Sequence, residues 1–189
     1  MLCRVPLFLL EEPESVFDLR PMPSAILVDL EGTLTGFCPL RRSVAGALVN
    51  FDTFAKSKGV DLSRLHYVTN AGVRDIRIEC PAISDRIHLQ AHKPFFTPPK
   101  EFRADPMQTI VVGDQYLTDG LLAWRWGFSF GLVRWSGQRP LWPRLQLAFG
   151  GLLSNLCFKT DVLQLPGLLA GDVKESRNDS PYGQEIRSV

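Results

Sequence analysis

Short apolar runs alternate with longer segments in which apolar residues recur at helical spacing. The runs predict buried β-strands at residues 24–29, 65–69, 86–89, 109–113 and 128–133. The longer segments predict helices at residues 43–58, 73–79 and 117–126. Strands that alternate with helices favour a parallel sheet with right-handed crossovers. The chain is therefore expected to have an α/β, Rossmann-like fold in which helices flank a parallel sheet.

The two ends of the chain differ from this middle part. Residues 1–23 are predicted to be an N-terminal lead-in, residues 24–160 a single domain, and residues 161–189 a disordered tail, because the chain turns polar from Gly171 on. The apolar start is short, is interrupted by Pro6 and is followed by acidic residues, which argues against a secretory signal. No apolar run reaches the roughly 18 residues that a transmembrane helix needs.

A second apolar stretch, at residues 135–158, has two interpretations. It combines aromatic residues and leucines with Arg139 and Arg144, as expected of a helix that lies in a membrane interface. A C-terminal helix packed against the sheet would also be apolar. Peripheral membrane contact and internal packing therefore both stay open.

Composition narrows the class of protein. A chain of 189 residues with 45% hydrophobic residues suits one compact domain. The net charge of +1 gives no electrostatic reason to expect nucleic-acid binding. The four cysteines contain no CxxC pair, so free thiols in a reducing compartment are expected. We therefore expect a cytoplasmic protein, or a mitochondrial one if the chain is eukaryotic.

Polar side chains follow the predicted strands at the points where these end. Asp29 ends the first strand, Thr69 ends the second and Asp114 follows the fourth. Lys93 comes after the third strand. In an open parallel sheet, ligands bind beyond the carboxyl ends of the strands, so these residues are expected to share one site.

The segment after the first strand, DLEGT, carries two carboxylates two residues apart. Asp29 can attack phosphorus as a nucleophile. Glu31 can protonate the leaving oxygen and later activate water, as general acid and then as general base. Taken alone, the segment also fits an ordinary turn after a strand.

The other motifs supply groups that bind phosphate and metal. Thr69 and Asn70 can hydrogen-bond phosphoryl oxygens, and Lys93 can neutralise phosphate charge. Asp114 and Asp119 lie on one strand-to-helix loop, where their carboxylates can bind a single Mg²⁺ ion. Each motif alone also fits a turn or a helix cap. Their order at successive strand ends is what favours one phosphate site.

The motifs DLEGTLT, VTN, HKP and VVGDQYLTD, in this order, resemble the haloacid dehalogenase (HAD) superfamily. The segment GDQYLTD is most similar to the capless subclass IIIA, which includes YqeG-type and mitochondrial phosphatidylglycerophosphate phosphatases. The resemblance implies a Mg²⁺-dependent phosphatase in which Asp29 forms an aspartyl-phosphate. It implies that Asp29, Asp114 and the backbone carbonyl of Leu30 bind Mg²⁺. The further roles it implies are phosphate binding by Thr69 and Lys93, and positioning of Lys93 or a water molecule by Asp119.

Two features depart from the family pattern. Glu31 stands where the family has aspartate, which makes the acid–base group one methylene longer. Pro98 and Pro99 follow Lys93 where the family has a helix. Because proline disfavours the interior of a helix, the helix there is expected to be shortened or the loop altered.

The spacing of the motifs leaves no room for a cap domain. Asp29 and Thr69 are 40 residues apart, and Thr69 and Lys93 are 24 apart. An uncapped site suits a bulky substrate, and the resemblance implies phosphatidylglycerophosphate, which would be hydrolysed to phosphatidylglycerol. A soluble phosphoester or phosphoprotein is the alternative substrate. A non-enzymatic binding module with the same fold is the alternative to catalysis.

Overall fold

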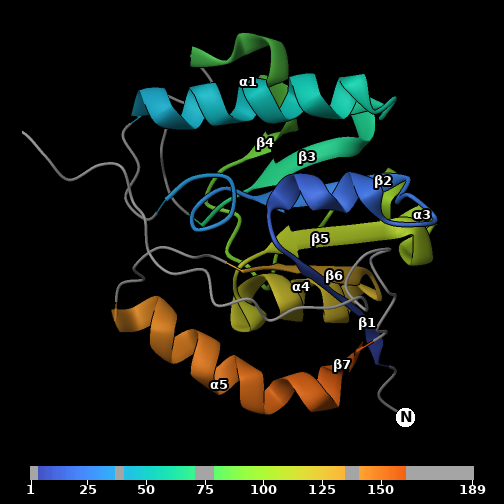
Figure 1. The fold of residues 1–189 in the computed structure, drawn as a ribbon, viewed down its shortest axis with the longest axis vertical. Coiled ribbons are helices and arrows are strands. Elements are labelled where there is room, and N and C mark those ends of the chain that lie inside the picture. The colour runs from blue at the N-terminus through green and yellow to red at the C-terminus, as the bar shows by residue number, and fades with distance from the viewer. Residues whose placement is uncertain (1–3, 37–40, 71–78, 135–140, 161–189) are drawn as a thin grey trace, which may run out of the picture.

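The computed structural model describes residues 4–36, 41–70, 79–134 and 141–160, and within them it has an α/β fold (Figure 1). Every pairing in its seven-stranded sheet is parallel, and the strand order is β4-β3-β2-β5-β6-β1-β7. The strands are β1 (Val5–Leu10), β2 (Ala25–Asp29), β3 (Leu65–Val68), β4 (Ile87–His88), β5 (Thr109–Gly113), β6 (Ser129–Val133) and β7 (Phe158–Thr160). The labelled helices are α1 (Arg41–Ser57), α3 (Lys100–Ala104), α4 (Leu121–Trp126) and α5 (Leu141–Cys157).

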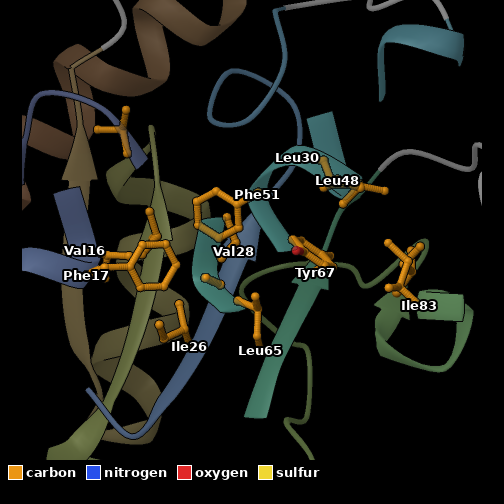
Figure 2. Packing of buried hydrophobic residues seen from close by; sticks show 14 of the residues in the cluster. Val16, Phe17, Ile26, Val28, Leu30, Leu48, Phe51, Leu65, Tyr67 and Ile83 are labelled. Carbon is orange, nitrogen blue, oxygen red and sulfur yellow. The ribbon is translucent and has the colours of Figure 1, made fainter. Parts of the chain in front are cut away.

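The central strands are buried on both faces of the sheet. In β2, Ile26 and Val28 pack with Phe51 of α1 in one apolar layer (Figure 2). Leu27, between them, points to the second layer, where it packs in the same cluster as Phe130 of β6. Because successive side chains of a strand alternate between faces, burial of both faces requires a continuous apolar run. This requirement explains the sequence of β2, AILVD, and of β5, TIVVG.

The elements agree with the sequence prediction over most of the central part. The α/β class, the parallel sheet and its flanking helices are confirmed, and this arrangement is compatible with a Rossmann-like fold. The helix predicted at 117–126 is divided into a π-helical turn, Tyr116–Gly120, and the short helix α4. Directly after Pro98 and Pro99, α3 is only five residues long, in agreement with the shortened helix expected from the two prolines. The helix predicted at 73–79 falls on residues that, apart from Glu79, lie outside the described part, and the tail 161–189 lies wholly outside it.

Two strands were not predicted. β1 lies in the lead-in 1–23 and pairs with both β6 and β7, so this segment adds a strand to the sheet. β7 directly follows α5. None of the helices in the described residues is long and apolar enough to cross a membrane.

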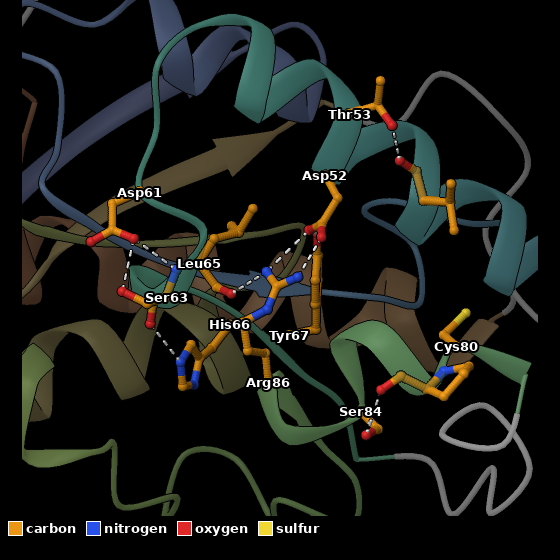
Figure 3. Close-up of polar contacts among 12 residues, drawn as sticks. Asp52, Thr53, Asp61, Ser63, Leu65, His66, Tyr67, Cys80, Ser84 and Arg86 are labelled. Carbon is orange, nitrogen blue, oxygen red and sulfur yellow. Dashed lines mark hydrogen bonds and ion pairs between the residues drawn. The ribbon is translucent and has the colours of Figure 1, made fainter.

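A buried polar network holds α1 to the sheet (Figure 3). The hydroxyl of Tyr67 in β3 donates to Oδ1 of Asp52 in α1 at 2.5 Å. Arg86, just before β4, pairs with both oxygens of Asp52 and donates to the Leu65 carbonyl at 3.0 Å. A two-pronged arginine–carboxylate pair fixes geometry as well as contributing energy. Burial and then Asp52 raise the pKa of Tyr67 far above its usual value, so the phenol stays a donor.

Candidate active site

The candidate site lies where neighbouring strands end. β3, β2 and β5 are adjacent and parallel, so their carboxyl ends share one edge of the sheet. Asp29 is the last residue of β2, and Asp114 directly follows β5. Thr69 directly follows β3 and is buried. The residues that the sequence placed at strand ends therefore do lie at one edge.

Lys93 forms ion pairs with two aspartates at this edge. Its Nζ lies 2.7 Å from Oδ1 of Asp29 and 2.5 Å from Oδ1 of Asp119. All three side chains are buried. Charge-assisted hydrogen bonds that are shielded from water are stronger than those at the surface. The ammonium group of Lys93 therefore connects the end of β2 to the loop after β5.

The end of β3 holds the backbone that carries Lys93. Oδ1 of Asn70 accepts a hydrogen bond from the Lys93 N–H at 2.7 Å. The carbonyl of Thr69 accepts one from the N–H of Ala91 at 2.9 Å. Asn70, which the sequence analysis placed among the phosphate-binding residues, thus also positions the lysine.

The same loop contains two strained residues. Gln90 has a φ of 50° and His92 a φ of 51°. Positive φ is uncommon for residues other than glycine, and it persists where the surroundings impose it. The hydrogen bonds from the end of β3 are such a constraint, and they keep Lys93 directed at the aspartates.

Asp119 is held by its own turn. The Gln115 N–H donates to Oδ2 of Asp119 at 3.3 Å, and the Thr118 hydroxyl donates at 3.2 Å. The side chain lies so close to Gly113 that a Cβ at that position would be 2.3 Å from Cγ of Asp119. Only glycine allows this approach of carboxylate to backbone. The sequence analysis missed Gly113, although a glycine at the end of a buried strand is a signal of close approach.

A tight turn follows Asp29. The Leu30 N–H donates to Oδ1 of Asp29 at 2.8 Å, and Gly32 adopts a φ of 79°. The Leu30 carbonyl accepts hydrogen bonds from the N–H groups of Leu34 at 3.0 Å and Thr35 at 2.9 Å. A metal bond to this carbonyl would compete with those bonds, so the ligand set proposed below uses carboxylates alone. Glu31 lies half-buried in the same turn.

Burial makes the charges of the site interdependent. The pKa of Asp29 is raised well above its usual value by burial and then by the charge of Asp119, and Lys93 offsets this only in part. Burial alone would lower the pKa of Lys93, but Asp119 and Asp29 raise it above its usual value. The lysine is therefore charged at physiological pH, whereas ionised Asp29 calls for more positive charge than Lys93 provides.

The carboxylates fit a divalent cation. Oxygens of Asp29, Asp114 and Asp119 lie within 4.8 Å of one another, and all three residues are buried. When ionised, they carry three negative charges against the single positive charge of Lys93. Buried charge without compensation is unfavourable, and oxygen ligands suit Mg²⁺. Both oxygens of Asp119 already have partners, Oδ1 in Lys93 and Oδ2 in the turn that carries it, so Asp29 and Asp114 are the residues that would hold the ion.

Comparison with protein-family models, curated proteins and solved structures finds no match for this chain. Function is therefore inferred from the residues of the site, from the order in which the sequence brings them to one edge, and from their contacts there.

Proposed function

We propose that this chain is a Mg²⁺-dependent phosphatase of the HAD type that forms an aspartyl-phosphate on Asp29. The observation that carries the proposal is the buried contact of Lys93 with Asp29 and Asp119, with Asp114 close by. A carboxylate nucleophile needs a neighbouring cation to stay ionised and positive charge to stabilise the phosphoryl group. The strand-end site supplies the lysine and a set of carboxylates suited to a metal ion.

In the first step, Asp29 attacks phosphorus and the ester P–O bond breaks. We assign the attack to Oδ2, because Oδ1 is held by the Leu30 N–H and by Lys93. The electron pair of the broken bond goes to the leaving oxygen, which takes a proton from Glu31. The alcohol leaves, and the phosphoryl group stays on Asp29 as an acyl phosphate.

In the second step, water attacks phosphorus and gives a proton to Glu31. The bond between phosphorus and Asp29 breaks, and its electron pair returns to the carboxylate. Inorganic phosphate leaves, and Glu31 regains the proton that it donated in the first step. Both residues return to their starting states.

The remaining residues bind and orient the phosphoryl group. Lys93 neutralises its oxygens, while Asp119 keeps the ammonium group in place. Thr69 and the amide group of Asn70 supply hydrogen-bond donors at the end of β3. Mg²⁺ held by Asp29 and Asp114 supplies further positive charge, which favours the ionised nucleophile and neutralises phosphate.

The proposed substrate is phosphatidylglycerophosphate, and the proposed fold is the capless form. Between Asp29 and Lys93, the described residues form α1, short turns, β3 and β4. A site without a cap admits a phosphate carried on a bulky molecule. The motif resemblance then supports a phospholipid as that molecule.

The test is phosphate release by the full chain, with Mg²⁺ or with EDTA, from phosphatidylglycerophosphate in detergent micelles and from an aryl phosphate. We expect Mg²⁺-dependent hydrolysis of both substrates. Asp29→Asn should lower kcat by about 10⁴-fold or more, because it removes the nucleophile. Circular dichroism should show that this variant remains folded.

The other outcomes separate the parts of the proposal. Hydrolysis of the aryl phosphate alone would keep the mechanism and overturn the lipid substrate. If the folded protein hydrolyses neither, Glu31→Asp is the next variant, since it restores the family residue. If that variant gained activity, the glutamate at position 31 would be the cause of the lost catalysis. If both proteins were inactive, a non-enzymatic binding module would be favoured.

A further inference from the structure

The outward face of α5 is apolar. Along this helix, large apolar residues recur every three or four positions, a spacing that places them on one side. The exposed fractions are 73% for Leu141, 42% for Leu145, 61% for Phe149, 76% for Leu152 and 61% for Leu156. Single exposed leucines are common on proteins, but a contiguous apolar stripe indicates an interaction surface.

The opposite side of α5 fixes this orientation. Gly150 lies against Tyr116, so closely that a Cβ at Gly150 would be 2.4 Å from Cβ of Tyr116. The Tyr116 ring in turn lies 5.9 Å from the rings of Phe130 and Phe158, measured between centroids. One side of α5 is therefore packed on the domain, and the apolar stripe faces away from it.

Between Asp119 and Asp161, the part of the sequence that contains α5 carries charge of one sign. From Gly120 to Thr160 the chain contains no aspartate or glutamate, and its charged residues are Arg125, Arg134, Arg139, Arg144 and Lys159. These five positive charges contrast with a net charge of +1 for the whole chain. Of them, Arg144 lies on α5 itself, and Arg134 and Lys159 are exposed in the strands or loops that flank it. An apolar helix face with arginine and lysine beside it is complementary to a surface that is apolar inside and negative outside.

We propose that α5 is a docking surface for an anionic lipid bilayer. Leu145, Phe149 and Leu152 enter the boundary between headgroups and acyl chains. Arg144, beside them on the helix, contacts the anionic headgroups. Because the other side of α5 stays packed on Tyr116, the domain lies on the membrane without changing its fold.

The direction of α5 relates this surface to the candidate active site. The helix connects β6 to β7, which are parallel members of one sheet, so it runs from the carboxyl edge back to the amino edge (Figure 1). Its first turn, at Leu141, lies toward the edge that carries Asp29. A bilayer along α5 therefore passes beside that edge. Delivery of a lipid phosphate to the site rests on the proposed function, whereas the docking itself does not.

The test is flotation of the full chain with vesicles of phosphatidylcholine alone and of phosphatidylcholine mixed with phosphatidylglycerol. The wild type is expected to float with the anionic vesicles and to bind neutral ones far more weakly. The double variant Phe149→Gln, Leu152→Gln removes two apolar side chains from the stripe, so its apparent affinity should fall by about tenfold or more. Arg144→Glu should weaken binding to anionic vesicles only.

Met107→Gln is the matched control, because Met107 is 73% exposed but lies in the turn before β5. This variant should float like the wild type. Unchanged flotation of the double variant, or equal binding to both vesicles, would overturn the proposal. The proposal would also be overturned if the wild type did not bind vesicles but formed dimers in analytical ultracentrifugation while the double variant was monomeric. In that case α5 would bind a second copy of the chain. The affected side chains are exposed, and equal thermal unfolding of all variants verifies that the fold is kept.

Discussion

Lys93 arranges the charges of the candidate site, although it comes from a loop and not from a strand. Its ammonium group contacts Asp29 and Asp119, two carboxylates that belong to different elements. Removing one partner of a buried ion pair leaves the other charge unpaired, at a cost of about 3–5 kcal/mol. The position of this one side chain therefore affects both the stability of the domain and its proposed chemistry.

Asn70 is expected to act through Lys93. Asn70→Ala removes the acceptor of the Lys93 N–H, and the strained loop should then relax and shift the ammonium group. A misplacement of about 1 Å can lower kcat by about 100-fold. Asn70→Asp keeps the acceptor for the Lys93 N–H but loses the amide donor, so its kcat should fall less than that of Asn70→Ala, while its added charge raises KM for phosphate esters. Equal loss of kcat in both variants, measured by phosphate release, would contradict the positioning role.

The raised pKa of Asp29 predicts how metal binding depends on pH. Its pKa is raised in the metal-free protein, so protonated Asp29 stabilises the fold below the usual carboxyl pKa of about 3.9. That stabilisation is lost as the pH rises through the raised pKa of the folded state. A divalent cation that binds ionised Asp29 reverses the loss, but it must displace the proton at lower pH.

Mg²⁺ is therefore expected to raise the Tm, and to raise it more at pH 7 than at pH 5. Differential scanning fluorimetry with Mg²⁺ or EDTA measures this increase in Tm at each of the two pH values. Asp29→Asn has no carboxyl group to titrate at this position, so its response to Mg²⁺ should be small and should depend less on pH. If Mg²⁺ raised the Tm of the wild type by the same amount at both pH values, binding of the ion by Asp29 would be contradicted.

Among the elements, the junction between β5 and the π-helical turn is tightly packed. The turn Tyr116–Gly120 carries Asp119, and Gly113 ends the strand beneath it. The same turn supports α5 through Tyr116 and Gly150. This short element therefore connects the candidate site to the proposed docking helix.

Gly113→Ala should displace the Asp119 side chain. Its Cβ would fall 2.3 Å from Cγ of Asp119, which is buried and already bound to Lys93. Overpacking of this kind lowers the free energy of unfolding by about 1–3 kcal/mol. Gly46→Ala is the control, because nothing lies within 4 Å of a Cβ at that helical position. It should stabilise the protein by about 0.5–1 kcal/mol, and urea unfolding that gives both variants the same sign would refute this description of Gly113.

For the molecule as a whole, the five strands from β4 to β6 in the sheet order were predicted from sequence, whereas β1 and β7, on the far side of the sheet, were not. β2 and β5 are covered on both faces, and only continuous apolar runs satisfy that environment. β1 has a similar run, but it stands at the start of the chain and contains Pro6, which disfavours a strand inside a sheet. β7 has only three residues. Its pairing depends on where α5 returns the chain, which local sequence does not specify.

The candidate site was predictable where it follows from strand ends. Asp29 and Asp114 lie at one edge because β2 and β5 are parallel neighbours. Two other contacts depend on loop conformations: the hydrogen bond from the Lys93 N–H to Asn70, and the close approach of Asp119 to Gly113. Such contacts are set by distances between segments that are far apart in sequence, and no local pattern encodes them.

The central claim is that Asp29 carries the phosphoryl group during turnover, and acid quenching followed by peptide mass spectrometry tests it most directly. Glu31→Gln should slow the attack of water and let the intermediate accumulate. With Mg²⁺ and an aryl phosphate, we expect one acid-stable phosphoryl group on the peptide that contains Asp29, and none in the double variant with Asp29→Asn. A phosphoryl group on another residue, or phosphate release with Asp29 never labelled, would contradict the mechanism.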